Sequence, residues 1–239
     1  MLATFINMAL VLLGGGLGLL FQNAISERLT AILTQALGLC VLGIGISSAL
    51  GTENMLCVIV CMVVGTVLGD LLDIERRLEG AGELLRVRLI KEESGSRFTE
   101  GFVNASLLFC VGAMAITGSI EAGLNHNYEI IVSKGVIDGV TSISFAATMG
   151  IGTAFSVIPL LIYQGGITLL AGWVGPYLPE AVITEMSAVG GALIIGIAVN
   201  MLGLGKEKIK VGNMLPAIFL PVAYIPLADW LCTLPGMLR

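Results

Sequence analysis

The sequence predicts an all-α integral membrane protein, a polytopic bundle of about eight transmembrane helices that forms a single membrane domain over residues 1–239. Two observations predict this class. Hydrophobic residues make up 56% of the chain and charged residues only 12%, where an average soluble domain has about a quarter charged residues. The apolar residues also form runs of about twenty residues, the length with which a helix crosses a bilayer. Because backbone groups in hydrocarbon must pair internally, and because the runs do not alternate as barrel strands do, helices are expected.

Eight apolar segments can be drawn along the chain. They are Leu2–Leu20, Leu29–Leu50, Met55–Leu72, Phe102–Ile120, Ile130–Met149, Thr153–Val174, Val182–Leu204 and Met214–Leu231. The first lacks the basic start of a cleaved signal, so we expect it to be retained as a span. A re-entrant segment between the fifth and sixth, near Gly150 and Gly152, would change the count.

Basic residues concentrate in two loops, which predicts the orientation. They are Arg76, Arg77, Arg86, Arg88, Lys91 and Arg97 after the third span, and Lys206, Lys208 and Lys210 after the seventh. With eight spans both loops lie on one side, which the positive-inside rule assigns to the cytoplasm, with both termini outside. Within the cytoplasmic loop 73–100, apolar residues recur at helical spacing. This favours a helix lying in the headgroup layer; a solvated linker is the alternative.

The chain also resembles itself at an offset of about 150 residues, as expected for an internal repeat. LVLLGGGLGLL near Leu10 is similar to LLIYQGGITLL near Leu160, and ALGLCVLGIGISSALG is similar to AVGGALIIGIAVNMLG. Residues 1–72 would form repeat 1, residues 101–149 two linking spans, and residues 150–239 repeat 2. Five spans separate the copies, so the second would be inverted, as in many secondary transporters. An old duplication kept for packing is the alternative.

The fifth span carries a polar stripe. Lys134 and Asp138 lie four residues apart and share a helix face with Thr141, and Ser142 lies beside it. Ionisable groups inside a bilayer are costly, so this face is expected to meet protein or water on a solute or proton path. Asp138 would then exchange a proton or bind a cation. In the structural alternative Lys134 reaches the outer surface and Asp138 caps a neighbouring helix.

Other residues of the predicted solute and ion pathway lie in other spans. Glycines that interrupt the first and sixth spans at matching places of the two repeats could mark broken helices with a substrate between them, or else allow helices to pack closely. Buried amides could bind solute or bridge helices. The residues are Gly15, Gly16, Gly165 and Gly166 for the glycines, and Asn104, Gln164 and Asn200 for the amides.

Several functions have no support in the sequence. No basic patch interleaved with aromatic residues indicates nucleic-acid binding. Cys57 and Cys61 lie one helical turn apart, but no second pair or histidine completes a metal site, so no metal or cofactor is expected. The single histidine, His126, falls in a predicted outer loop without a catalytic partner, so an enzyme is not expected.

One stretch resembles a known group. FVNASLLFCVGAMAITGSIEAGL (Phe102–Leu124), Lys134, Asp138 and PLLIYQGGITLLA (Pro159–Ala171) are similar to the bacterial inner-membrane proteins collected as the domain of unknown function 554 family. The resemblance covers essentially the whole chain. It implies a prokaryotic plasma membrane and a transporter label, and it assigns no substrate residues. Ala113 stands where many relatives are expected to have a proline, so the resemblance does not establish a kink there.

Together these features predict a secondary transporter of a small polar or anionic solute, coupled to a proton or sodium gradient. The competing hypotheses are a passive channel and a non-transporting scaffold or regulator that acts through residues 73–100. Small-residue helix faces favour a homo-oligomer, most simply a dimer, within the lipid bilayer.

Overall fold

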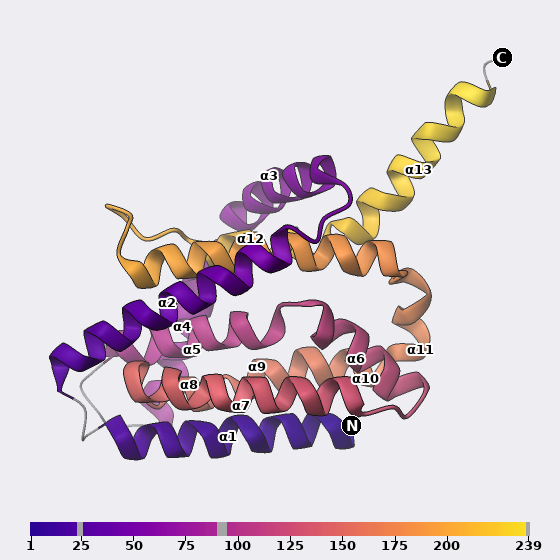
Figure 1. Cartoon of the computed structure of the whole chain (residues 1–239). Coiled ribbons are helices and arrows are strands. Elements are labelled where there is room, and N and C mark those ends of the chain that lie inside the picture. The colour runs from indigo at the N-terminus through magenta and orange to yellow at the C-terminus, as the bar shows by residue number, and fades with distance from the viewer. Residues whose placement is uncertain (23–25, 90–94, 238–239) are drawn as a thin grey trace.

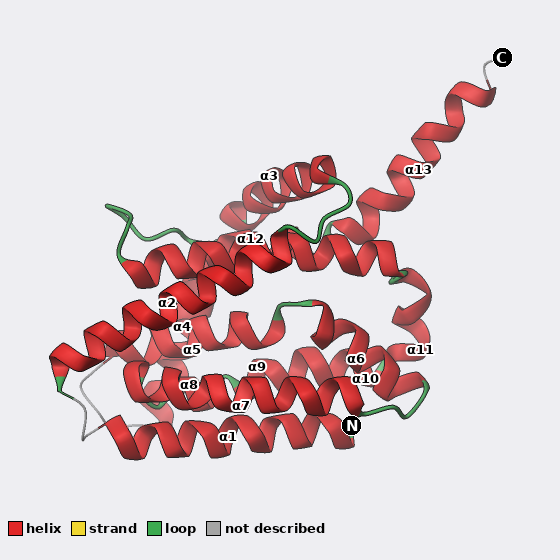
Figure 2. Cartoon of the chain, viewed as in Figure 1, coloured by secondary structure: helices red, strands yellow, loops and turns green. Residues whose placement is uncertain are grey.

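The computed structural model describes residues 1–22, 26–89 and 95–237, and every regular element in these ranges is a helix (Figure 2). Within them, five segments are long and apolar enough to cross a bilayer alone: α1 (Leu2–Gln22), α2 (Glu27–Ala49), α7 (Glu129–Met149), the stretch Gly152–Leu169 and α12 (Glu180–Leu202). Three pairs qualify only together: α3 (Met55–Leu71) with α4 (Ile74–Leu89), α5 (Gly95–Cys110) with α6 (Ala113–Leu124), and η3 (Val211–Phe219) with α13 (Pro221–Met237). The all-helical class is therefore as predicted, with five to eight candidate spans.

The predicted sixth span is helical but irregular. It consists of α8 (Gly152–Phe155), α9 (Val157–Leu160), the π-helix η1 (Leu161–Gly165) and α10 (Gly166–Leu169). Together they pass the length and apolarity test for a span, so the described structure gives a full-length segment between the predicted fifth and seventh spans. Two short elements, α11 (Ala171–Val174) and η2 (Gly175–Tyr177), lead into α12.

The helices α1 and α7 lie side by side (Figure 1), and glycines bring their backbones into contact. A Cβ added at Gly14 would overlap the carbonyl oxygen of Gly139, and one at Gly18 would overlap that of Ile143. Gly135 in turn lies against the backbone of Asn7. Of the two interpretations of these glycines, the structure favours close packing, because α1 runs unbroken through them and they let two backbones touch.

Two further helix pairs pack closely in an antiparallel sense. Gly45 of α2 and Gly191 of α12 each lie against the other's carbonyl oxygen. Gly69 of α3 lies against Asn213 of η3, and Gly65 lies against Ala217. These small-residue faces are thus occupied within one chain, and the predicted dimer stays a prediction.

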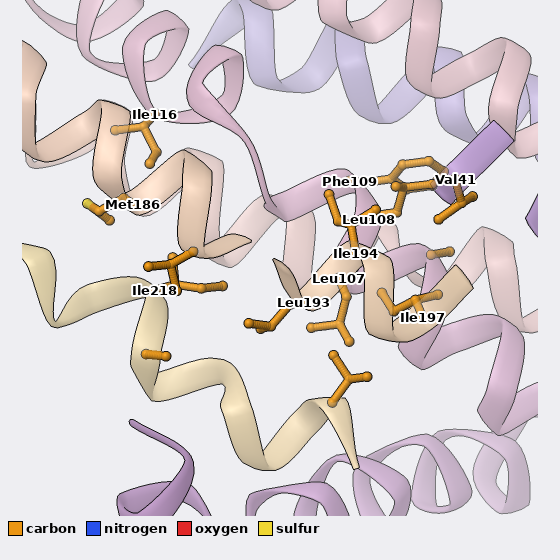
Figure 3. Close-up of a cluster of buried hydrophobic side chains, with 14 of the residues drawn as sticks. Val41, Leu107, Leu108, Phe109, Ile116, Met186, Leu193, Ile194, Ile197 and Ile218 are labelled. Carbon is orange, nitrogen blue, oxygen red and sulfur yellow. The ribbon is translucent and has the colours of Figure 1, made fainter. Parts of the chain in front are cut away.

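The apolar core lies between α5, α6, α12 and η3, with α2 at one side (Figure 3). It includes Phe109 beside Leu108 on α5, and Leu193, Ile194 and Ile197 on α12. Phe109 is 1% exposed and comes directly before the end of α5. The core therefore fixes the last turn of α5 in place, which matters for the site described below.

The two basic loops come together at one end of the bundle (Figure 1). Lys208, in the loop after α12, forms an ion pair of 3.1 Å with Glu100 on α5. The N-terminus lies at the opposite end, and α13 extends away from the bundle toward the C-terminus (Figure 1). The helix expected in the loop 73–100 is present as α4, bent by 58° from α3. Its place in the headgroup layer stays a prediction, and Lys91 lies outside the described residues.

The glycine contact between α1 and α7 yields a matched pair of variants. We expect Gly14→Ala to lower the free energy of unfolding by about 1–3 kcal/mol, because its Cβ meets backbone that cannot move independently. Gly16→Ala, two residues along the same helix, has nothing within 4 Å of the added atom. It should be neutral or stabilising by up to about 1 kcal/mol. Thermal unfolding of both variants in detergent measures the difference, and equal melting temperatures would refute the close contact.

Candidate functional site

The polar stripe predicted on the fifth span is buried inside the protein. Lys134 and Asp138 are 5% and 6% exposed, and the Nζ of Lys134 donates a hydrogen bond to Oδ2 of Asp138 as an ion pair. Asp138 is the tenth of the 21 residues of α7, so it lies about 14 Å along the helix axis, near the middle of a span. Lys134 thus turns inward to its partner and does not extend to the outer surface.

The ion pair meets a break in a neighbouring helix. α5 ends at Cys110 and α6 begins at Ala113, with a bend of 61° between them. At Gly112 the backbone has φ 118° and ψ 152°, a conformation that is essentially restricted to glycine. The break interrupts the helical hydrogen bonds in the middle of a predicted span, where lipid offers no replacement.

Two side chains satisfy two of the backbone groups that the break releases. The carbonyl oxygen of Phe109 would ordinarily accept from the amide of Ala113. It accepts instead from Nζ of Lys134 at 2.7 Å, and the amide of Ala113 donates to Oγ of Ser187 on α12 at 3.2 Å. Lys134 therefore binds both the end of α5 and the carboxylate on its own helix.

Two buried amides extend the network away from the ion pair. Nδ2 of Asn7 on α1 donates to Oδ2 of Asp138 at 3.2 Å and to Oε1 of Gln164 at 3.0 Å. Both amides are at most 1% exposed. Oδ1 of Asn7 and Nε2 of Gln164 have no hydrogen-bond partner among the described residues. One acceptor and one donor of this amide pair are thus left unsatisfied inside the protein, which is rare for buried polar groups.

The position of Gln164 is unusual because it lies in the π-helix η1. Single π-turns inside α-helices are uncommon and are frequent at functional sites. Here the π-turn contains Gln164, whose Oε1 accepts a hydrogen bond from Asn7. The network therefore connects a π-turn, an unbroken helix and a broken helix.

A cavity of about 370 Å³ adjoins the ion pair and the break. It is lined from α2, α5, α6, α7 and α12, and its hydroxyl groups come from Ser48, Thr141 and Ser187. Its rim includes Ile44 and Ile137, which are 44% and 54% exposed. The cavity is large enough for a small solute, and it presents hydroxyls, the N-terminal end of α6 and the Lys134–Asp138 pair.

The remaining residues of the predicted polar stripe have separate positions. Thr141 lines the cavity while its Oγ1 donates to the carbonyl of Ile137 at 2.8 Å. Ser142 is fully buried and donates to the carbonyl of Val11 at 2.9 Å, so it links α7 to α1. Gly15 lies opposite Ser142 in that contact. Ser142 and Gly15 therefore hold α1 against α7 at the level just beyond Asp138.

The other predicted glycines do not break a helix. Gly165 ends η1 and Gly166 begins α10, and both keep right-handed helical dihedrals. A Cβ at Gly165 would lie 3.4 Å from Met1, whereas Gly16 and Gly166 have nothing within 4 Å. The idea of two matching glycine breaks is wrong, because the break in the structure lies at Gly112.

Two predicted amides lie at another place in the bundle. Asn200 on α12 forms a two-point contact with Ile209, donating to its carbonyl and accepting from its amide, both at 2.8 Å. Asn104 lies 3.9 Å from the sulfur of Met149. Both line a second cavity of about 590 Å³, which also includes Glu100 and Lys208 at the basic-loop end. Asn200 thus fixes the loop after α12, and neither amide lines the cavity beside Lys134.

Glu185 is a further buried carboxylate on α12, and its contacts are those of a structural cap. It accepts from Oγ1 of Thr52 at 2.7 Å and from the amides of Glu53 and Asn54 at 2.8 and 2.9 Å. These bonds hold the turn that starts α3, where Asn54 is the N-cap.

Among the described residues, no group of three or more His, Cys, Asp or Glu side chains could hold a metal ion.

Residues 2–225 match the sequence profile of the family described as "Protein of unknown function (DUF554)". The chain belongs to this family. Proteins with similar sequences include the "Uncharacterized membrane protein YdfK" of Bacillus subtilis (strain 168), 31% identical over 94% of this chain and 96% of that protein. The "Uncharacterized protein YqgA" of Escherichia coli (strain K12) is 30% identical over 90% of this chain and 92% of its own length. No solved structure matches the chain.

Membership of the DUF554 family confirms the resemblance seen in the sequence, and the name of the Bacillus protein agrees with a membrane protein.

The sequence predicts Lys134, Asp138, Thr141 and Gln164 as site residues, and the structure places them around one network and its cavity. Sequence analysis missed Asn7, a lone amide in the first span that could have been found by the reasoning applied to Asn104. It also missed the break at Gly112, because the apolar run continues across it.

The backbone at Gly112 can be tested by a single methyl group. A Cβ at Gly112 meets nothing within 4 Å, so Gly112→Ala changes only the ease of the positive φ. We expect it to lower the free energy of unfolding by about 1–3 kcal/mol. Gly166→Ala, also without neighbours but with helical dihedrals, serves as the control and should not destabilise. Chemical or thermal unfolding in detergent gives both values, and a neutral Gly112→Ala would argue against the broken geometry.

Proposed function

We propose that this protein is a secondary transporter of a small polar or anionic solute, coupled to a proton or sodium gradient. The observation that carries the proposal is the broken helix α5–α6: the end of α5 binds Lys134 of the buried Lys134–Asp138 pair, and the break lies beside a cavity of about 370 Å³. Discontinuous helices with their ends at mid-membrane are a recurring way to build solute and ion sites in transporters. The N-terminal end of α6, with its partial positive charge, favours a polar or anionic group in the cavity.

A purely structural role explains these features less well. A buried ion pair contributes little net stability compared with apolar residues, and inside a bilayer the cost of its charges is higher. The break at Gly112 also gives up helical hydrogen bonds that a continuous span would keep at no cost. Both features are costly for packing alone and useful for a site that must exchange polar ligands.

The neighbour relations between helices support an inverted repeat. The predicted second and seventh spans, α2 and α12, pack on each other, and so do α3 and η3 of the third and eighth. Two inverted halves that cross in this way can exchange conformations and open the site to either side. The first and sixth spans differ in form, since α1 is continuous whereas its counterpart contains the π-helix.

We also propose that the basic-loop end faces the cytoplasm of a prokaryotic cell, with both termini outside the inner membrane. The positive-inside rule supports this, because the opposite-side turns Gly51–Asn54 and Asn125–Tyr128 carry no Lys or Arg.

Reporter fusions test the orientation. Alkaline phosphatase joined after Met237 should be active, because that enzyme folds only outside the cytoplasm, whereas the same reporter inserted after Gly205 should be inactive. Green fluorescent protein at the two positions should give the reverse pattern. An active phosphatase at Gly205 would refute the orientation.

The transport proposal is tested in two steps. A thermal-shift screen of the purified protein against small metabolites and ions should find a solute that raises the melting temperature. At a hundred times its Kd, such a solute should add about 2.7 kcal/mol to the free energy of unfolding. Uptake of that solute into proteoliposomes should depend on an imposed ion gradient. We expect Asp138→Asn to reduce uptake to the level of empty vesicles while the protein remains folded.

Asp229→Asn is the matched control, because Asp229 is an exposed carboxylate on α13 and should transport normally. Normal uptake by Asp138→Asn would refute the proposed role of the site. Flux that persists after an ionophore removes the gradient would instead indicate a passive channel. Activity lost when residues 73–100 are replaced by a neutral linker, without any solute binding, would favour the scaffold hypothesis.

A further inference from the structure

We propose that the ammonium group of Lys134 is the built-in occupant of a monovalent cation site formed by the carboxylate of Asp138 and the carbonyl oxygen of Phe109. The proposal rests on the transport function and deepens it, because it says which ion the site does not need. A chain that carries its own cation at this place requires no bound sodium ion there.

The ligands around Nζ of Lys134 are those of a cation site. The carbonyl of Phe109 accepts at 2.7 Å and Oδ2 of Asp138 accepts on the other side. The carbonyl is free for this because the break at Gly112 removes its helical donor. Carbonyls at the C-terminal ends of broken helices, together with carboxylates, are the oxygen ligands that bind sodium in transporters.

The electrostatics of the site also require a positive charge. The C-terminal end of α5 carries partial negative charge from its unpaired carbonyls. Asp138 adds a full negative charge at 6% exposure, and a buried charge without a partner is strongly unfavourable. Asn7 gives the carboxylate one hydrogen bond at 3.2 Å but no charge. A cation is therefore needed wherever Asp138 is ionised, and Lys134 supplies it from one turn earlier on the same helix.

A free cation could reach this place if the side chain were shortened. Both Lys134 and Asp138 line the cavity of about 370 Å³, so water and a small ion have room beside them. Removal of the ammonium leaves the carboxylate and the Phe109 carbonyl converging on a volume that a sodium ion with one or two waters can fill. Sodium, a small hard cation, prefers such oxygen ligands.

The experiment compares melting temperatures in sodium chloride and choline chloride at equal ionic strength. Wild-type protein should show no sodium-specific difference. For Lys134→Ala, sodium at about ten times its Kd should raise the melting temperature by roughly 3–6 °C. Lys134→Met removes the charge but keeps most of the volume, so its response should be smaller. Lys134→Ala combined with Asp138→Asn lacks the carboxylate and should not respond.

Three results would overturn the proposal. The first is a folded Lys134→Ala variant that responds to sodium no more than the double variant does. The second is a Lys134→Ala variant that folds in neither salt while the double variant folds, because the site would then not accept a free cation. The third needs no variant: specific stabilisation of the wild-type protein by sodium would show that Lys134 does not occupy the site. If every variant fails to fold, a wild-type protein that sodium does not specifically stabilise would support the proposal.

These measurements use no transported solute, so they separate the two proposals. A sodium response in Lys134→Ala with no solute uptake by any form would reject the transport function and keep the cation site. Gradient-dependent uptake by the wild type, together with a folded Lys134→Ala variant that does not respond to sodium, would reject the built-in cation and keep the transport function.

Discussion

Hydrocarbon provides no hydrogen bonds, so a helix that breaks inside it must find partners for its backbone groups within the protein. The arrangement around Gly112 follows from this requirement. The carbonyl at the end of α5 takes a charged donor, Lys134, and the amide at the start of α6 takes a neutral hydroxyl, Ser187. The charged donor then needs a counter-ion, which is Asp138, and the counter-ion takes an additional amide from Asn7. One local break in a helix is thus matched by polar residues on three other helices.

The fold was largely predictable because the lipid environment makes a strong demand on composition. Runs of about twenty apolar residues can only be helices there, so each of the eight predicted segments is helical in the structure, as one helix or as several short ones. What composition cannot specify is the regularity of each helix. The run across Phe109, Gly112 and Ala113 is uniformly apolar, and without a proline nothing in it distinguishes a break from a continuous helix. The break arises from tertiary contacts that a single segment does not contain.

The candidate site was predictable in part for the same reason. Lys134 and Asp138 are conspicuous because charges in a span are costly, and their spacing of four residues predicted that they share one helix face. The glycines were harder to interpret, because glycine is favoured both where helices pack closely and where a helix breaks. At Gly14 and Gly18 packing was the correct reading, because α7 offers its backbone directly opposite. Asn7 was overlooked because an amide by itself fits many roles, and only its two contacts define this one.

The helix α12 contacts both the site and the turn before α3 through residues two positions apart. Ser187 binds the start of α6, and Glu185 binds the turn Thr52–Asn54 that begins α3. A rigid helix cannot shift one of these attachments without shifting the other. A translation or tilt of α12 would therefore displace the broken helix and α3 together. Any rigid-body movement of α12 therefore couples the position of the start of α6 to the position of the start of α3.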